Sequence, residues 1–181
     1  MNDRADRIIK EHVLWSIGAG LVPLPLLDIV AVTAVQLDML KQLASLHSIP
    51  FTESEGKAWV SALAGNVMAR VGANALKLIP GVGTLLGGVS MSILAGASTY
   101  AIGQVATSHF ETGGTFASVD MSSAKRRYEE ELERGKRVAE GLRGEKKDVI
   151  DKLERLAKLH EKGVLSDEEF EAQKKRVLSS V

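Results

Sequence analysis

The fold of this protein is decided by residues 78–110, which read LIPGVGTLLGGVSMSILAGASTYAIGQVATSHF. These 33 residues contain no Asp, Glu, Lys or Arg. Exposing so much apolar surface to water is unfavourable, so the segment is expected to be covered by other helices or by lipid. Its length would suffice for a membrane-spanning helix. Its Gly, Ser and Thr residues lower its hydrophobicity, however, and favour burial inside a helical body.

Helices are predicted on both sides of this stretch from the spacing of apolar residues and from chain breaks. Helical spacing covers residues 3–22, 26–47 and 52–78, and continues in the uncharged segment to about His109. Because aromatic residues make up only 4% of the chain and Gly numbers 17, we expect small residues to allow close helix contacts. The glycines assigned to such contacts are Gly65, Gly72, Gly83, Gly87, Gly96 and Gly103.

The apolar part of the chain repeats a short proline motif. Residues 21–25 (LVPLP) resemble residues 78–82 (LIPGV) at an offset of 57 residues. Each motif lies between two predicted helices, which indicates two helix–turn–helix units packed together in an all-α fold. The residues expected to form these turns are Pro23, Pro25, Pro80 and Gly81. Asp28 is expected to be the N-cap of the following helix, with a functional intramembrane carboxylate as the alternative.

Charged residues are concentrated in the C-terminal part. Residues 1–119 contain 7 of the 23 basic and 8 of the 23 acidic residues, although the formal net charge of the chain is zero. The sequence ETGGTFASVD at 111–120 has the composition of a turn. We therefore predict an apolar helical domain over 1–112, a linker over 113–121, a charged helix over 122–150 and a helical hairpin over 151–181.

The charged helix is expected to begin at a cap formed by Ser122 or Ser123. Apolar or small positions recur along it at spacings of four and three, although glycine and lysine interrupt the pattern. These positions are Tyr128, Leu132, Gly135, Ala139, Leu142, Lys146, Val149, Leu153 and Leu156. Two interpretations remain open: a solvated single helix, or a parallel coiled-coil stalk through which copies of the chain associate.

The last thirty residues contain the signals of two short helices. Gly163 stands where a left-handed C-cap belongs, and Ser166 and Glu169 have the spacing of a capping box. The side chains expected to associate here are Leu153, Leu156, Leu159, Phe170 and Leu178. The pattern over about 151–178 resembles the short C-terminal domain family called SHOCT. That resemblance implies a small helical hairpin with an oligomerisation or docking role and no catalysis.

The apolar part also resembles a known family. The motifs are VPLPLLD at 22–28, TAVQLDML at 33–40, LIPGVG at 78–83 and TYAIG at 99–103. They are similar to the domain of unknown function that occurs fused to, or beside, bacterial Era-like GTPases and in related inner-membrane proteins. Over residues 10–110, the resemblance implies a membrane-associated helical module on the cytoplasmic side of the inner membrane. It also implies a GTPase or stress-linked partner, to which any nucleotide chemistry would belong.

No motif for catalysis or cofactor binding is found in the sequence. The glycines at 81, 83 and 87 have neither the spacing of a dinucleotide-binding fingerprint nor the Gly-Lys-Ser/Thr end of a P-loop. The four histidines are far apart and lack the spacing of metal ligands. Zero net charge also argues against a general nucleic-acid binder. We therefore expect no catalytic residue, cofactor, metal, nucleic-acid partner or small-molecule substrate.

One basic cluster directly follows the apolar part of the chain. Lys125, Arg126 and Arg127 could contact anionic lipid headgroups, at about 1 kcal/mol per charge. They could equally be a solvated helix start that is offset by the acidic residues 129–131. Both interpretations stay open at this point.

Three functions are compatible with these observations. The favoured one is a non-enzymatic, membrane-associated scaffold or adaptor that forms homo-oligomers and works with a GTPase. The alternative is a soluble cytoplasmic oligomer whose apolar helices are buried internally. A pore-forming membrane protein is the third.

Overall fold

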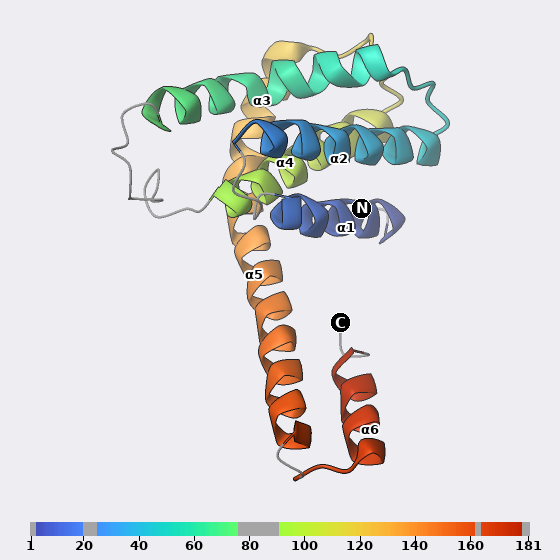
Figure 1. Cartoon of the computed structure of the whole chain (residues 1–181). Helices are drawn as coiled ribbons and strands as arrows, with labels where there is room; N and C mark the ends of the chain where they lie inside the picture. The colour runs from blue at the N-terminus through green and yellow to red at the C-terminus, as the bar shows by residue number, and fades with distance from the viewer. Residues whose placement is uncertain (1–2, 20–24, 76–90, 162–163, 179–181) are drawn as a thin grey trace. The chain divides into compact units, whose positions relative to one another are not determined.

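The computed structural model describes residues 3–19, 25–75, 91–161 and 164–178. Every regular element in these ranges is an α-helix, which confirms the predicted all-α class (Figure 1). The six helices are α1 (Asp3–Ala19), α2 (Pro25–Leu46), α3 (Glu53–Ala75), α4 (Met91–Glu111), α5 (Met121–Glu161) and α6 (Asp167–Leu178). The chain forms two compact units, a body over Met1–Ala139 and a tail over Glu140–Val181.

Helix α4 is the centre of the body. Its most extensive contact is with α1, and α2 and α3 also pack on it. A Cβ atom built on Gly96 would lie 2.8 Å from Ile17, and one on Gly103 would lie 2.7 Å from Ile9. Since a methyl group would clash at these distances, glycine is what lets α1 lie so close to α4. The order of these contacts also shows that α1 and α4 run antiparallel.

The first part of α5 covers another side of α4. Tyr128 is 1% exposed and Ala139 is fully buried, so this segment belongs to the core of the body. A Cβ atom on Gly135 would lie 2.6 Å from the carbonyl oxygen of Ala97, so here α5 passes directly over the α4 backbone. The body therefore extends to Ala139, beyond the boundary at 113–121 that the change in charge density suggests.

The cap of α5 differs from the prediction. Asp120 accepts hydrogen bonds from the backbone N–H of Ser122 at 3.1 Å and of Ser123 at 3.4 Å. The Ser123 hydroxyl donates to the same carboxylate at 2.6 Å. The helix thus begins at Met121, and the cap is the preceding aspartate rather than either serine, because a carboxylate can accept from two backbone donors at once.

Helix α3 begins as the sequence predicts. Thr52 accepts from the backbone N–H of Glu55 at 3.3 Å and donates to its carboxylate at 2.6 Å. One turn later Trp59 is buried against Phe110 and Phe116, and its indole N–H donates to the Phe116 carbonyl at 3.1 Å. This aromatic cluster fixes the start of α3 beside the end of α4.

Helix α2 begins one residue earlier than expected. The helix begins at Pro25, a residue well suited to the first helical position, where no amide donor is needed. Asp28 therefore lies inside the first turns of α2 and is not its N-cap. Its side chain lies outside the described residues, as do Pro23, Pro80, Gly81, Gly83 and Gly87.

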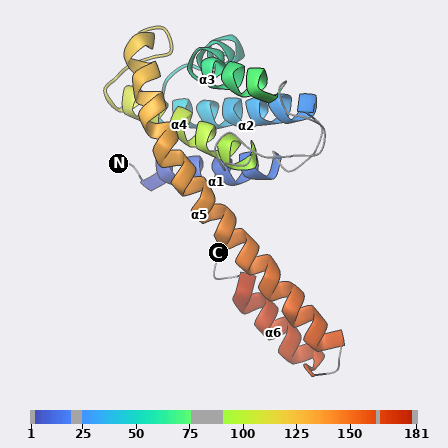
Figure 2. The same ribbon diagram turned by 90° about the vertical axis from the view of Figure 1, so that its left-hand side faces the viewer.

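The tail is a helical hairpin in which α6 folds back beside the end of α5 (Figure 2). The backbone N–H of Ser166 donates to Glu169 at 3.0 Å, and that of Glu169 donates to the Ser166 hydroxyl at 3.2 Å, which is the reciprocal capping pattern. The rings of His160 and Phe170 stack with centroids 4.7 Å apart. Gly163 lies outside the described residues.

Candidate functional site

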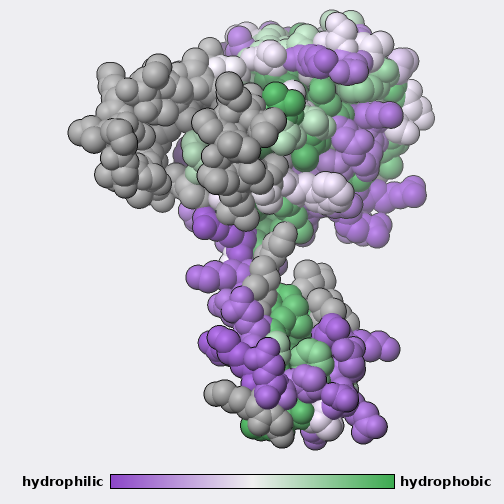
Figure 3. Space-filling view, viewed as in Figure 1, coloured by the Kyte–Doolittle hydropathy of each residue, from purple (hydrophilic) through white to green (hydrophobic). Residues whose placement is uncertain are grey.

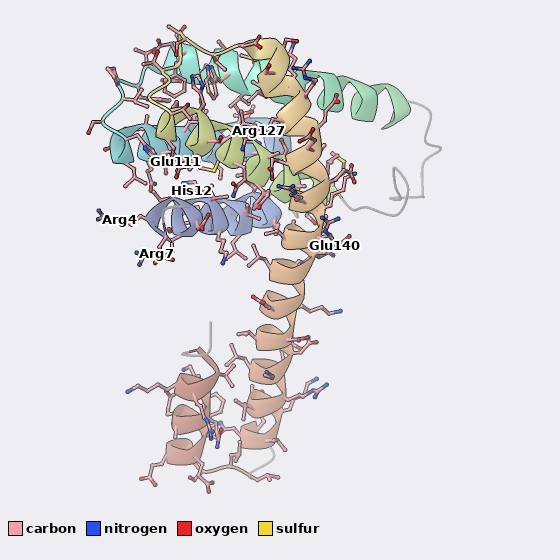
Figure 4. The ribbon with its side chains drawn as sticks, turned by 180° about the vertical axis from the view of Figure 1, so that it is seen from behind. Arg4, Arg7, His12, Glu111, Arg127 and Glu140 are labelled. Atoms are coloured by element: carbon pink, nitrogen blue, oxygen red, sulfur yellow. The ribbon has the colours of Figure 1, made fainter. Side chains whose placement is uncertain are left out.

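The part of the body formed by α1–α4 is polarised, because these helices alternate in direction and most of their charges gather at one end. The described charges of α1 all lie in residues 3–11, and the only charge of α4 is Glu111, its last residue. In α3 three of the four charges lie in residues 53–57. We call this the charged end; Figure 4 shows Arg4, Arg7 and Glu111 there, and Figure 3 shows its hydrophilic side chains at the right of the body.

The opposite end of the body carries exposed apolar side chains. We call it the uncharged end and define it by the end of α1, the start of α2, the end of α3 and the start of α4. Trp15 is 64% exposed, Val30 66% and Met91 53%, and each lies within about two helical turns of this end. These are all the exposed large hydrophobic residues found in the described part of the body.

Two charged residues of α1–α4 are exceptions to this polarity, and the first part of α5, which also belongs to the body, carries charges of its own. Asp28 and Arg70 lie near the uncharged end by their positions in α2 and α3, and their side chains are outside the described residues. The segments that join the helices there, 20–24 and 76–90, contain a single charged residue in sequence, Lys77.

The charged end contains a buried histidine bound to a carboxylate. The Nδ1 atom of His12 lies 2.7 Å from the carbonyl oxygen of Ile8, and its Nε2 atom lies 3.0 Å from the Asp38 carboxylate. The carbonyl oxygen and the carboxylate are both hydrogen-bond acceptors, so the imidazole ring lies between two acceptors. The hydrogen bond from His12 lowers the pKa of Asp38 below its usual value, and a second bond from Gln42 acts in the same direction.

A groove of about 620 Å³ opens beside this pair. It lies between α1 and α2 and is lined by Arg4, Asp38, Lys41, Gln42, Ser45 and Leu46. Its charged lining residues are two cations, Arg4 and Lys41, and one carboxylate, Asp38.

The centre of the body contains a polar network that the sequence analysis missed. Thr99 of α4 shares hydrogen bonds with Ser16 of α1 at 2.7 Å and with Gln36 of α2 at 3.2 Å. The neighbouring Ser98 accepts from Gln36 at 3.3 Å and from the Tyr128 hydroxyl of α5 at 2.9 Å. All five side chains are at most 2% exposed, so each would be costly to bury without these partners. Spacing alone could not reveal the network, because its members come from four different helices.

Burial also raises the pKa of the Tyr128 hydroxyl to about 12, so the group stays a hydrogen-bond donor across the physiological range. The network therefore links α1, α2 and α5 to α4 through uncharged groups. Its bonds are all internal, and it presents no reactive atom to solvent. We infer that this network fixes the positions of α1, α2, α4 and α5 relative to one another.

The predicted basic cluster lies away from the uncharged end. Lys125, Arg126 and Arg127 are exposed on the first turns of α5. Arg127 lines a small pocket of about 220 Å³ with Ser108 and His109 of α4. These α4 positions are more than about 20 Å along the helix from Met91. The cluster and the uncharged end could therefore not meet the same membrane surface in one upright orientation.

The predicted contact glycines have different surroundings. Gly96 and Gly103 lie at close helix contacts, whereas nothing described lies within 4 Å of a Cβ atom built on Gly65. Gly72 lies in α3, but its surroundings are outside the described residues. Sequence reasoning did not select Gly135 as a contact, although it makes one of the closest backbone approaches described. The sequence did contain one signal for this contact, because Gly135 is a glycine at a heptad position of the charged helix.

The described ranges contain no group of three His, Asp or Glu side chains placed to hold a metal ion. Among the helices as described, none is both long enough and apolar enough to cross a membrane.

Comparison with known proteins places this geometry in a family. Residues 1–137, which is nearly the whole body, match the model described as domain of unknown function DUF697. The chain belongs to the DUF697 family. Residues 151–178 of the tail match the short C-terminal domain, SHOCT. Both matches confirm the resemblances drawn from the sequence.

A curated relative of this DUF697 protein is magnetosome membrane protein 22 of Magnetospirillum gryphiswaldense. The two are 40% identical over 147 residues, which cover 78% of this chain and 75% of the relative. No solved structure matches the chain.

The tail residues selected for association lie on the SHOCT hairpin. Leu153, Leu156 and Phe170 are half-buried there, and Leu159 is 40% exposed. The side chain of Leu178, the last residue of α6, is outside the described residues. None of the described side chains of the tail is fully buried, so this hairpin has little core of its own.

Proposed function

We propose that this DUF697 protein is a non-enzymatic, membrane-associated helical scaffold whose body contacts lipid through its uncharged end. The single observation that carries the proposal is the polarity of the body: charges gather at one end, and Trp15, Val30 and Met91 are exposed toward the other. Each large apolar side chain moved from water into lipid contributes about 1.5–3 kcal/mol. Tryptophan is also favoured at membrane interfaces.

The name of the relative supports this proposal. Magnetosome membrane protein 22 is a membrane protein by its printed name, and the identity extends over most of both chains. An uncharged surface at one end would allow association with a bilayer without a helix that crosses it.

The two tryptophans of the chain provide a direct test. Trp15 is 64% exposed toward the uncharged end, whereas Trp59 is 2% exposed in the aromatic cluster. In a Trp59→Phe variant, Trp15 becomes the only indole. We expect vesicles that contain brominated phosphatidylcholine and phosphatidylglycerol to quench its fluorescence and shift its emission to the blue.

The matched control is Trp15→Phe, which leaves only the buried Trp59. Vesicles should leave the fluorescence of this variant nearly unchanged, because its indole stays inside the body. If the protein floats with vesicles but Trp15 is not quenched, another surface binds lipid. If it does not float at all, the membrane proposal is wrong.

A second candidate is a soluble oligomer that buries its apolar helices internally. It is favoured by α4, in which 15 residues are buried within the body. A monodisperse particle without detergent and without vesicle binding would support it.

Two further parts of the scaffold proposal concern partners. We propose that the SHOCT hairpin associates with other copies of the chain, because its leucines are only half-covered. We also propose a GTPase partner, for which the support is the family resemblance. Co-expression with a GTPase encoded beside this chain, followed by co-purification through the body, would test that partner.

A further inference from the structure

We propose that the first part of α5 limits how deeply the body enters the membrane, so that the body occupies part of one leaflet. This inference rests on the proposed lipid contact of the uncharged end. It specifies how deeply the uncharged end enters the bilayer and which residues lie at the headgroups. Both follow from the place at which α5 crosses α4.

The crossing is steep. Tyr128 bonds to Ser98, Gly135 lies over Ala97, and Ala139 lies against Gly96. Over the four residues from 135 to 139, α5 therefore advances by about 6 Å while these close contacts move by only one residue along α4. Figure 1 shows this part of α5 running across the direction of the other helices of the body.

The crossing lies close to the uncharged end. Residues 96–98 are five to seven positions from Met91, the first residue of α4, which is about 8–10 Å along the helix. One leaflet of a bilayer has a hydrocarbon thickness of about 15 Å. Met91 could therefore reach the middle of the bilayer only if α5 also entered the hydrocarbon.

The outer face of α5 is unsuited to hydrocarbon at this level. Lys136 and Glu133 form an ion pair at 2.6 Å, and Arg137 is exposed beside them. Charged side chains are expensive in the hydrocarbon and stable among headgroups. The steep crossing would lay these charges along the membrane surface.

Helix α5 is also held firmly against α4. A residue larger than glycine at 135 would meet backbone atoms of Ala97, and the Tyr128–Ser98 bond is buried. Displacing α5 would leave these polar groups unpaired. The helix therefore acts as a fixed stop, with Met91 and Val30 in the acyl region and Arg137 at the headgroups.

Spin-label depth measurements test this arrangement, and the absence of cysteine from the chain allows single labels to be placed without other changes. We would label Val30→Cys, Met91→Cys, Arg137→Cys and Ser45→Cys variants, the last at the charged end. With vesicles of phosphatidylcholine and phosphatidylglycerol, oxygen and nickel accessibilities should place positions 30 and 91 in the acyl region, 137 at the headgroups and 45 in water.

A triple variant tests whether α5 is the stop. Glu133→Leu, Lys136→Leu and Arg137→Leu together remove both members of the ion pair and the charge of Arg137. We expect the label at position 91 to move deeper by roughly one helical turn (~5 Å). The control carries the same change of charges at the other end, Asp3→Leu, Arg4→Leu and Arg7→Leu, and should leave the depth unchanged.

The outcomes separate this inference from the proposed function. If the protein floats with vesicles but position 91 has the same depth in the α5 variant, α5 does not limit the depth of the body. The proposed lipid contact would remain intact. A label at 91 near the bilayer centre in the otherwise native chain would lead to the same conclusion. Failure of every labelled variant to float would instead defeat the lipid contact itself.

Discussion

Gly135 lies where α5 comes nearest to the backbone of α4. A Cβ atom there would be 2.6 Å from the Ala97 carbonyl oxygen and 3.0 Å from its Cα, and neither atom can move aside as a side chain would. Gly141, in the same helix, has no described neighbour within 4 Å of its Cβ position. Replacing each glycine by alanine therefore distinguishes the effect of close packing, at Gly135, from the effect of helix propensity alone, at Gly141.

We expect Gly135→Ala to lower the free energy of unfolding by about 1–3 kcal/mol, because α5 must move away from α4 to make room. Gly141→Ala should instead raise it by about 0.5–1 kcal/mol, since alanine is the better helix former. Urea unfolding of both variants would measure the difference. Equal effects of the two substitutions would contradict the close approach.

At the charged end, one hydrogen-bonded pair, His12 and Asp38, links α1 to α2. The His12 side chain is 6% exposed and that of Asp38 is 57% exposed, so one partner is buried and the other reaches solvent. The pKa of Asp38 is lower in the folded protein than its usual 3.8, first because of the bond from His12. Its contribution to stability is therefore complete above the usual pKa and is lost as the pH falls through the lower folded value.

Asp38→Asn should reduce the free energy of unfolding at neutral pH by up to about 1 kcal/mol, a range that takes the exposure of the carboxylate into account. The difference from the native chain should shrink as the medium is acidified and vanish once Asp38 is protonated in both states. Asp3→Asn, in an open pair of 3.9 Å, is the control and should have little effect. A difference that is constant with pH would refute this assignment.

At the scale of elements, α5 has two roles along its length. Its first half carries Tyr128, Leu132 and Ala139 into the core of the body, and its second half joins the hairpin of the tail. The heptad positions in the first half of α5 are thus already buried against other helices of the same chain. A coiled-coil stalk through the whole helix would compete with these contacts.

Truncation tests this division. A chain that ends after Ala139 should keep a cooperative thermal transition, because the body is complete there. A chain that ends after Met121 should lose that transition or aggregate, since α4 would lose the cover of α5. Circular dichroism melts and light scattering would report both. A stable, monodisperse shorter fragment would show that α5 is dispensable to the core.

For the whole molecule, the polarity of the body is the feature that matters most. Helices α1 and α4 each carry their charges at one end, and antiparallel packing brings those ends together. The resulting uncharged end of the body depends on the packing, because the uncharged ends of α1 and α4 would not lie side by side if the two helices ran parallel. The proposed lipid contact follows from this arrangement.

Met91→Lys should weaken vesicle binding by about tenfold or more, because it removes one apolar side chain whose transfer from water into lipid contributes about 1.5–3 kcal/mol. Ser45→Lys adds the same charge at the opposite end and should leave zwitterionic vesicle binding unchanged. Flotation at a series of lipid concentrations would give both affinities. Equal losses would show that the end of the body does not matter.

The sequence alone was sufficient for the helices and their family. The uncharged stretch and the Thr52 and Ser166 caps locate these elements, since each depends on neighbours within one or two turns. Pro25 and Asp120 mark where prediction failed at helix starts, because several adjacent residues could serve as first residue or cap and the backbone selects one.

Only the tertiary structure decided what those helices do together. The polar network around Thr99, the approach of Gly135 to Ala97 and the division of charge between two ends all join residues distant in the chain. Such pairings depend on the direction and depth of each helix crossing. Spacing within one helix contains no information about either quantity, which is why the candidate lipid contact became visible only in the folded body.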